Sequence, residues 1–232
     1  VTENIVSGKV GRVLGGSIGD SAVKPTNWRY PENTFLGETT INISGGTIAE
    51  LYGGCLGRNM NIVGSANATG NTCDSYFYGN ININITGGEI TGNIYGAGAG
   101  GVTGYNVNSS DPYKTYGEDF DTNVNINISN GTINGDIYGG GYGYTEYLNA
   151  NVTAVDGGAL YGDSNITISG TPTINGNVFA AGCGYNLSSK PNIAQMFGNS
   201  KITISGTPTI NGSIFGGGAG LNGYSNMAKL TG

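Results

Sequence analysis

The sequence contains no histidine, and only 10% of its 232 residues are charged, well below the roughly 25% of ordinary globular chains. Without histidine, imidazole-based catalytic triads and most zinc sites are excluded. The nine basic residues form no stripe with interleaved aromatic residues and the net charge is −6, so the electrostatic pattern of a nucleic-acid-binding protein is missing. We expect no metal, no other cofactor and no nucleic-acid partner.

Long apolar runs are also missing. No stretch approaches the ~20 apolar residues that span a bilayer, and an acidic chain is a poor ligand for anionic lipid, so we expect no membrane insertion. Apolar residues do not recur at the i, i+3, i+4, i+7 spacing of an amphipathic helix. The sequence therefore argues against a helical fold.

Cysteine is scarce, and its three positions do not have the spacing of a metal site. Cys55 and Cys73 flank one inserted loop and are the plausible disulfide pair in an oxidising environment. Burial as small apolar side chains is the other interpretation, and the sequence does not decide between the two. Cys183 is three repeats away from Cys55, too far for a bridge.

What the sequence does contain is glycine, at 45 residues, and an internal repeat. Each copy has a run of isoleucines alternating with polar residues, a Gly-Gly or Thr-Pro turn, a further isoleucine, and an aromatic residue followed by glycine or alanine. The copies are about 36 to 43 residues apart when aligned on the isoleucine or valine after the turn: Val10, Ile48, Ile90, Ile133, Ile174 and Ile210. Such repetition predicts a stack of one structural unit.

Three short strands are predicted in each copy. The first is the alternating run, as at Ile41-Asn42-Ile43, and the second begins at the isoleucine after the turn. The third carries the aromatic residues Tyr52, Tyr95, Tyr138, Phe179 and Phe215. A further aromatic-glycine step precedes most first strands, as at Tyr78-Gly79 and Tyr116-Gly117, and is expected in the same wall or at the corner that enters it.

Stacking these units about 4.8 Å apart would pair each strand in parallel with its copies above and below. Two internal columns of isoleucine result, one through Ile41, Ile83, Ile126, Ile166 and Ile202, the other through Ile43, Ile85, Ile128, Ile168 and Ile204. Outside them runs a polar ladder of Asn42, Asn84, Asn127, Thr167 and Thr203. We predict an all-β fold, a single-stranded right-handed parallel β-helix (β-solenoid) of about five to six coils. One repeat domain covers 1–232, with coils near 5–16, 35–55, 77–99, 116–141, 160–183 and 196–219.

Variation in length is confined to the segment between one Gly-Gly step and the next first strand. Long loops should therefore leave the stack at one corner, roughly over 17–34, 56–76, 99–114, 142–159 and 183–195, and gather on one flank. Loops on a rigid scaffold are where binding usually resides. The candidate ligand-contacting aromatic residues are Trp28, Tyr105, Tyr113, Tyr142, Tyr144, Tyr147 and Tyr185. Packing of these rings against the coil wall is the other interpretation.

The acidic residues do not form a recognisable active site. Right-handed parallel β-helices often cleave polysaccharides, and a hydrolase needs two carboxylates across the scissile bond. Glu50 and Asp136 hold near-equivalent positions but are not on adjacent coils, and the acidic run 118–121 lacks the spacing and glycine of a calcium loop. We assign no catalytic residue and no metal ligand, and we predict that the chain is not an enzyme.

The recurring pattern Ile-x-Ile-Ser-Gly-Gly-Thr-Ile…Ile-Tyr-Gly-Gly-Gly resembles the glycine-rich β-helical repeats of large secreted or wall-attached bacterial surface proteins, adhesins included. The resemblance covers nearly the whole chain, but it specifies a coil rather than a ligand, so no functional residue carries over. It implies an extracellular, cell-surface location and a structural or adhesive role. The implied partner is a protein or glycan on a host or neighbouring cell.

Two alternatives remain open. One is a carbohydrate-active β-helix, a polysaccharide lyase or hydrolase whose site lies in the loops. The other is a self-assembling fibre subunit, because the end coils of a solenoid expose strand edges that invite end-to-end self-association. We also expect the chain to be a piece of a longer protein.

Overall fold

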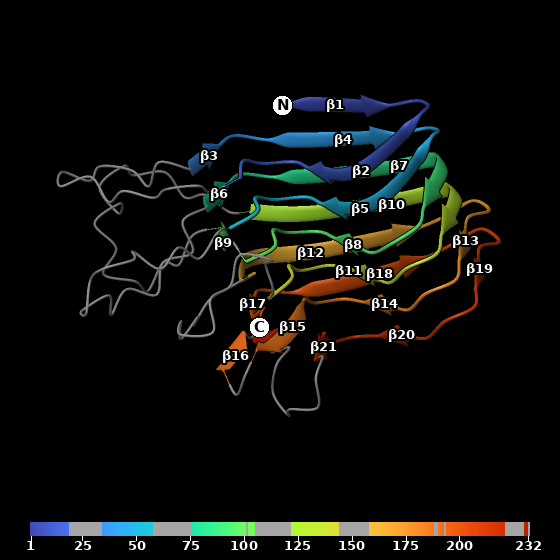
Figure 1. The fold of residues 1–232 in the computed structure, drawn as a ribbon. Coiled ribbons are helices and arrows are strands. Elements are labelled where there is room, and N and C mark those ends of the chain that lie inside the picture. The colour runs from blue at the N-terminus through green and yellow to red at the C-terminus, as the bar shows by residue number, and fades with distance from the viewer. Residues whose placement is uncertain are drawn as a thin grey trace, which may run out of the picture.

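The computed structural model is a parallel β-solenoid, and no helix occurs in the residues that it describes (Figure 1). These residues are 1–18, 34–57, 76–100, 102–104, 122–143, 158–187, 190–192, 194–220 and 230–231. The predicted fold class is confirmed. The strands make about four turns, somewhat fewer than the five to six coils predicted.

The first wall contains the alternating isoleucine strands. Parallel, in-register pairing joins β1 (Thr2–Ile5), β4 (Thr39–Ile43), β7 (Ile81–Ile90), β10 (Thr122–Ile133), β12 (Leu160–Ile168) and β18 (Ser200–Ile204). The predicted columns are confirmed. Ile83, for example, pairs with Ile41 above and Ile126 below. From the second to the fifth copy, both isoleucine columns are at most 1% exposed to solvent.

A second wall begins after the glycine turn and a third follows it. The second pairs β2 (Lys9–Leu14) with β5 (Thr47–Tyr52), and continues through the ends of β7 and β10 to β13 (Thr173–Ile174) and β19 (Thr209–Ile210). The third starts at the ends of β2 and β5 and continues through β8 (Ile94–Tyr95), β11 (Ile137–Tyr138), β14 (Val178–Phe179) and β20 (Ile214–Phe215). The three walls enclose one hydrophobic core.

The aromatic-glycine step forms a ladder of its own at the corner that leads into the first wall. This entry ladder pairs β3 (Thr34–Leu36), β6 (Tyr76–Tyr78), β9 (Val102–Gly104), the start of β12, β17 (Met196–Phe197) and β22 (Leu230–Thr231). Gly79, with φ of +134°, and Gly162, with φ of +151°, follow the ladder in a backbone conformation that glycine adopts without strain. The predicted corner position of this step is confirmed.

One member of the entry ladder is not the segment that the sequence pattern placed there. The pattern put Tyr116-Gly117 at this step, whereas β9, with Thr103 and Gly104, pairs with β6 and β12. Tyr116 lies outside the described residues. Because β9 follows Gly100 almost directly, the loop of this coil is inserted after the entry ladder, between β9 and β10, rather than before it.

A small three-stranded sheet lies beside the lower coils. β15 (Cys183–Leu187) pairs antiparallel with β16 (Lys190–Asn192) and parallel with β21 (Ala219–Gly220). The hairpin begins where the fifth coil leaves its third wall. Part of the segment 183–195, predicted as a loop, is therefore a β-hairpin continuous with the stack.

The stacked isoleucines should differ sharply in their contribution to stability according to coil. Ile128 is 1% exposed, whereas Ile204, in the same column on the last coil, is 43% exposed. We expect Ile128→Ala to lower the free energy of unfolding by about 2–5 kcal/mol, because it leaves a cavity between two coils. Ile204→Ala should cost much less. Urea denaturation followed by circular dichroism measures both, and equal losses would contradict the enclosed column.

A second substitution should stabilise the protein. Ser164 is fully buried, and its hydroxyl has no hydrogen-bond partner among the described residues. The same column holds Ile81 and Val124 on the preceding coils. Ser164→Val replaces an unsatisfied buried hydroxyl with a side chain of that column, so we expect a gain of about 1 kcal/mol or more in the same denaturation experiment. A loss of stability would show that the Ser164 hydroxyl is satisfied.

Candidate functional site

The loops attach to the stack along one edge, which we call the loop flank. The described chain stops at Ile18, Gly57 and Gly143, each a few residues after a third-wall strand, and resumes at Thr34, Tyr76 and Gly158 on or beside the entry ladder. Bridges join the departing segments to one another: Ile18 pairs with Leu56, Ala99 with Tyr142, and Tyr142 with Cys183. In Figure 1 the ends of β3, β6 and β9 lie together on this edge.

The third-wall aromatic residues form a continuous stack beside the loop flank. Tyr52, Tyr95, Tyr138, Phe179 and Phe215 follow one another with ring centroids 4.7–5.1 Å apart and rings 6–8° from parallel. Each aromatic residue follows a core-facing residue, and because side chains alternate along a strand, the rings point away from the main core. The rings of Tyr52, Tyr95 and Tyr138 form a second buried cluster with Leu56, Ala99 and Cys183 from the departing segments, and Phe179 packs against it.

Of the seven candidate aromatic residues, only the side chain of Tyr142 is described. Its ring stacks on Tyr95 with centroids 4.7 Å apart and lies partly buried against the second cluster. This contact is the packing role considered for such residues, and ligand contact by Tyr142 stays a prediction. The backbone of Tyr185 lies in β15. Outside the described residues lie Trp28, Tyr105, Tyr113, Tyr144 and Tyr147, as well as Cys73 and the acidic run 118–121.

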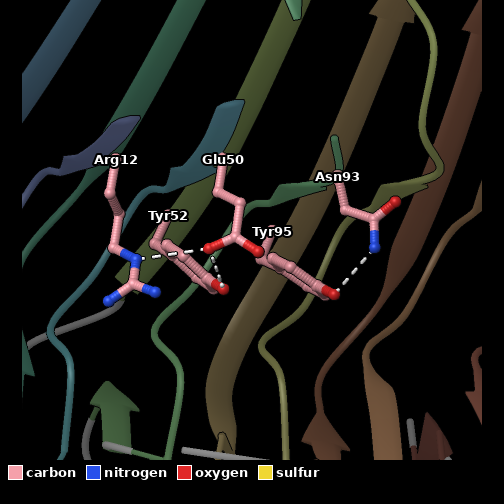
Figure 2. A network of polar contacts seen from close by, with 5 residues as sticks. All are labelled: Arg12, Glu50, Tyr52, Asn93 and Tyr95. Atoms are coloured by element: carbon pink, nitrogen blue, oxygen red, sulfur yellow. Dashed lines mark hydrogen bonds and ion pairs between the residues drawn. The ribbon is translucent and has the colours of Figure 1, made fainter. Parts of the chain in front are cut away.

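The phenol hydroxyls of the stack meet a column of polar residues that the sequence reasoning missed (Figure 2). Tyr52 donates a hydrogen bond to Glu50 Oε2 (3.2 Å), and Asn93 Nδ2 donates to the Tyr95 hydroxyl (3.0 Å). One coil further on, Tyr138 donates to Asp136 Oδ2 (3.0 Å). A polar residue two positions before each tyrosine was the available signal, because i and i+2 side chains share one face of a strand.

The N-terminal end of this column carries an ion pair. Arg12 Nε lies 3.2 Å from Glu50 Oε2, and the Arg12 guanidinium carbon lies 6.0 Å from the centre of the Tyr52 ring. Both charged side chains are partly exposed, so the pair adds only modestly to stability. Its main effect is to hold Glu50 against the edge of the tyrosine.

Further along the column, both carboxylate oxygens of Asp136 accept hydrogen bonds. Its Oδ1 accepts from the backbone N–H of Asn177 (2.7 Å), while its own N–H donates to Asn93 Oδ1 (2.8 Å). Glu50 and Asp136 are separated by the coil that carries Asn93. In the described part of the chain, no three Cys, Asp or Glu side chains come close enough to hold a metal ion.

Asparagine ladders cover the outer face of the first and second walls. Asn42 Nδ2 donates to Asn4 Oδ1, Asn84 to Asn42, and Asn127 to Asn84, at 2.9–3.0 Å. Other ladders begin on a carboxylate, as where Asn82 donates to Glu38 and Asn134 to Glu89 (both 2.8 Å). Since a carboxylate only accepts, these amides must point their nitrogen toward the preceding coil. The predicted polar ladder is confirmed.

The cysteines have separate environments. Cys55 is 1% exposed within the main core, and Cys73 is not described, so the predicted alternatives for this pair stay open. Cys183 is fully buried in the second cluster, and burial raises the pKa of its thiol to about 12. The thiol of Cys183 is therefore protonated and unreactive at neutral pH.

The buried tyrosines predict a loss of stability in alkali. Burial raises the pKa of Tyr52, Tyr95 and Tyr138 above the ordinary value of 10, and the carboxylates beside Tyr52 and Tyr138 raise it further. In the unfolded chain these phenols ionise near pH 10, so the native state binds more protons above that pH. Their contribution is complete below about pH 10 and falls by about 1.4 kcal/mol per tyrosine for each further pH unit.

Equilibrium unfolding between pH 8 and 11, with tyrosinate absorbance recorded in parallel, measures this effect. We expect the absorbance of these three residues to appear only together with unfolding. Tyr138→Phe should flatten the decline by about 1.4 kcal/mol per pH unit. Tyrosinate formed by all fifteen tyrosines in the folded protein near pH 10 would contradict the buried stack.

No helix in the described residues is both long and apolar enough to cross a membrane. Comparison of the chain with protein-family models, with curated proteins and with solved structures gives no match. Function is therefore inferred from the geometry of the coils and of the loop flank.

Proposed function

We propose that this chain is an extracellular repeat domain of a bacterial surface protein, with a structural and adhesive role. In this proposal the solenoid is the rigid support and the loop flank binds a protein or glycan on a host or neighbouring cell. The observation that carries the proposal is the common attachment of the loops. Three segments leave the stack beside one set of bridged residues and resume on or beside one entry ladder, whereas the segment 105–121 lies between the entry ladder and the first wall.

The interior of the stack supports a mechanical rather than a chemical role. Its columns are isoleucine, and its outer faces carry asparagine amides bonded to one another along the axis. The low charge agrees with this arrangement, because a charged residue repeated on every coil would lie against its own copy. A neutral, rigid shaft displaying loops on one side suits adhesion at a surface.

The carbohydrate-active alternative gains no support from the best-placed carboxylates. An inverting hydrolase needs a free acid and a free base about 6.5–9.5 Å apart. Glu50 is paired with Arg12 and Tyr52, and Asp136 accepts hydrogen bonds from Tyr138 and Asn177. Carboxylates held in this way are structural acceptors. A site made by the loops alone would need its acids from outside this column.

A binding assay paired with a turnover assay tests the proposal. We expect the chain to bind selected members of a glycan array, or an intact bacterial or host cell surface, without releasing reducing sugar. Changing Trp28, Tyr105, Tyr113, Tyr144 and Tyr147 together to Ser should abolish binding and leave the thermal midpoint nearly unchanged. A matched control is Val6→Ser, which alters a side chain that is 69% exposed away from this edge. Release of sugar, or binding that survives the loop substitutions, would contradict the proposal.

A further inference from the structure

Three asparagine-glycine steps are stacked at the corner between the second and third walls: Asn134-Gly135, Asn175-Gly176 and Asn211-Gly212. Each directly follows the isoleucine that ends a second-wall strand, and the asparagines are exposed. In Figure 1 the strands β13 and β19, which lead into this corner, lie on the side of the stack away from β3, β6 and β9. The corner is therefore separate from the loop flank.

Coil stacking itself requires glycine after these asparagines. A Cβ on Gly135 would collide with the carbonyl oxygen of Gly92 on the preceding coil, and a Cβ on Gly176 with that of Gly135. The N–H groups of Gly135 and Gly176 make no hydrogen bond to any other residue in the described coils. Because glycine has no side chain to hinder ring closure, its backbone nitrogen can attack the carbonyl carbon of a preceding asparagine side chain.

Asn134 and Asn175 differ in one neighbour. The Oδ1 atom of each accepts a hydrogen bond from the asparagine of the next coil (both 2.8 Å). Asn175 donates its Nδ2 to the neutral Oδ1 of Asn134, whereas Asn134 donates its Nδ2 to Glu89 Oε1 (2.8 Å). The carboxylate thus lies against the nitrogen that would leave as ammonia. It stabilises the positive charge that develops on this nitrogen as it takes up a proton.

We propose that Asn134 is a site of spontaneous deamidation, and that Glu89 makes it react faster than Asn175 in the same ladder. The Gly135 N–H loses its proton to water, and the nitrogen forms a bond to Asn134 Cγ to close a succinimide ring. The Cγ–Nδ2 bond breaks, and Nδ2 takes up a proton and leaves as ammonia. Water then opens the ring at either carbonyl and leaves aspartate or isoaspartate. The net reaction consumes water and releases ammonia, with no oxidant or other co-reactant.

Deamidation at this position changes the stack. The product carboxylate cannot donate a hydrogen bond to Glu89, and two carboxylates then lie side by side in the ladder, where like charges repel. Isoaspartate also routes the main chain through the former side-chain methylene, at a corner whose spacing is set by the stacked glycines. The corner of this coil should therefore loosen as the protein ages.

Peptide mapping by mass spectrometry, during incubation of the purified chain at mildly alkaline pH, tests this inference. We expect Asn134 to be converted to aspartate and isoaspartate roughly three- to tenfold faster than Asn175, because a hydrogen bond to a charged group is about twice as strong as a neutral one. Glu89→Gln keeps the acceptor and removes the charge, so it should slow Asn134 by a similar factor and leave Asn175 unchanged. An Asn134 that stays intact, equal rates at the two sites, or a rate that Glu89→Gln does not alter would overturn the proposal.

Two further variants measure the consequence for the stack. Asn134→Asp and Asn175→Asp both lose one donated hydrogen bond, but only the first places a carboxylate against Glu89. We expect Asn134→Asp to lower the thermal midpoint by a few degrees more than Asn175→Asp, and the difference to disappear in the Glu89→Gln background, where the glutamine amide can donate to the new carboxylate. Circular dichroism confirms that each variant folds. A difference that persists in that background would overturn the proposed repulsion.

Discussion

Each coil of the solenoid is held by parallel, in-register stacking on its neighbours. A single coil has too little interior to bury its own isoleucines, so its stability comes from the coils above and below. In-register stacking brings the same kind of residue into contact from coil to coil. Isoleucine packs on isoleucine, asparagine hydrogen-bonds to asparagine, and aromatic rings stack on one another. Only side chains that interact favourably with their own copies can be repeated under this constraint.

This constraint explains how charge is placed. A carboxylate stacked on a carboxylate would be repelled, and in the described coils these acids lie instead against a neutral or basic partner on a neighbouring coil. Asn82 follows Glu38, Asn134 follows Glu89, and Asp136 lies between Asn93 and Asn177. Glu3 is an exception, because it stands at the end of an apolar column, paired with Ile41, and begins no amide ladder.

The sequence predicted the isoleucine columns well because two patterns, the alternation within each strand and the repeat between coils, select the same residues. Alternation within a strand gave the inward face of Ile41 and Ile43, and the repeat gave their vertical partners. It misplaced the entry step of the fourth coil because Val102-Thr103-Gly104 has no aromatic residue to mark it, whereas Tyr116-Gly117 does. Pairing in the sheet depends on backbone register and a suitable turn, so the segment nearest the departing strand took that position.

The repeat pattern could not have predicted the second cluster of buried residues. Leu56, Ala99, Tyr142 and Cys183 hold neighbouring positions but share no residue type, so no periodic signal links them. Their common property is burial against the tyrosine stack, which appears only once the chain is folded. The residues that hydrogen-bond to the tyrosine hydroxyls could have been predicted from the sequence, because Glu50, Asn93 and Asp136 each lie two residues before a tyrosine.

Equivalent isoleucines of successive coils lie directly over one another in a closed core. Nuclear Overhauser contacts between assigned isoleucine methyl groups measure this arrangement most directly. From the in-register pairing of the coils we expect contacts along the series Ile41 to Ile83, Ile83 to Ile126 and Ile126 to Ile166, and none between Ile41 and Ile166. Isoleucine methyls in contact mainly with their own coil, or accessible to a soluble paramagnetic agent in the middle coils, would contradict it.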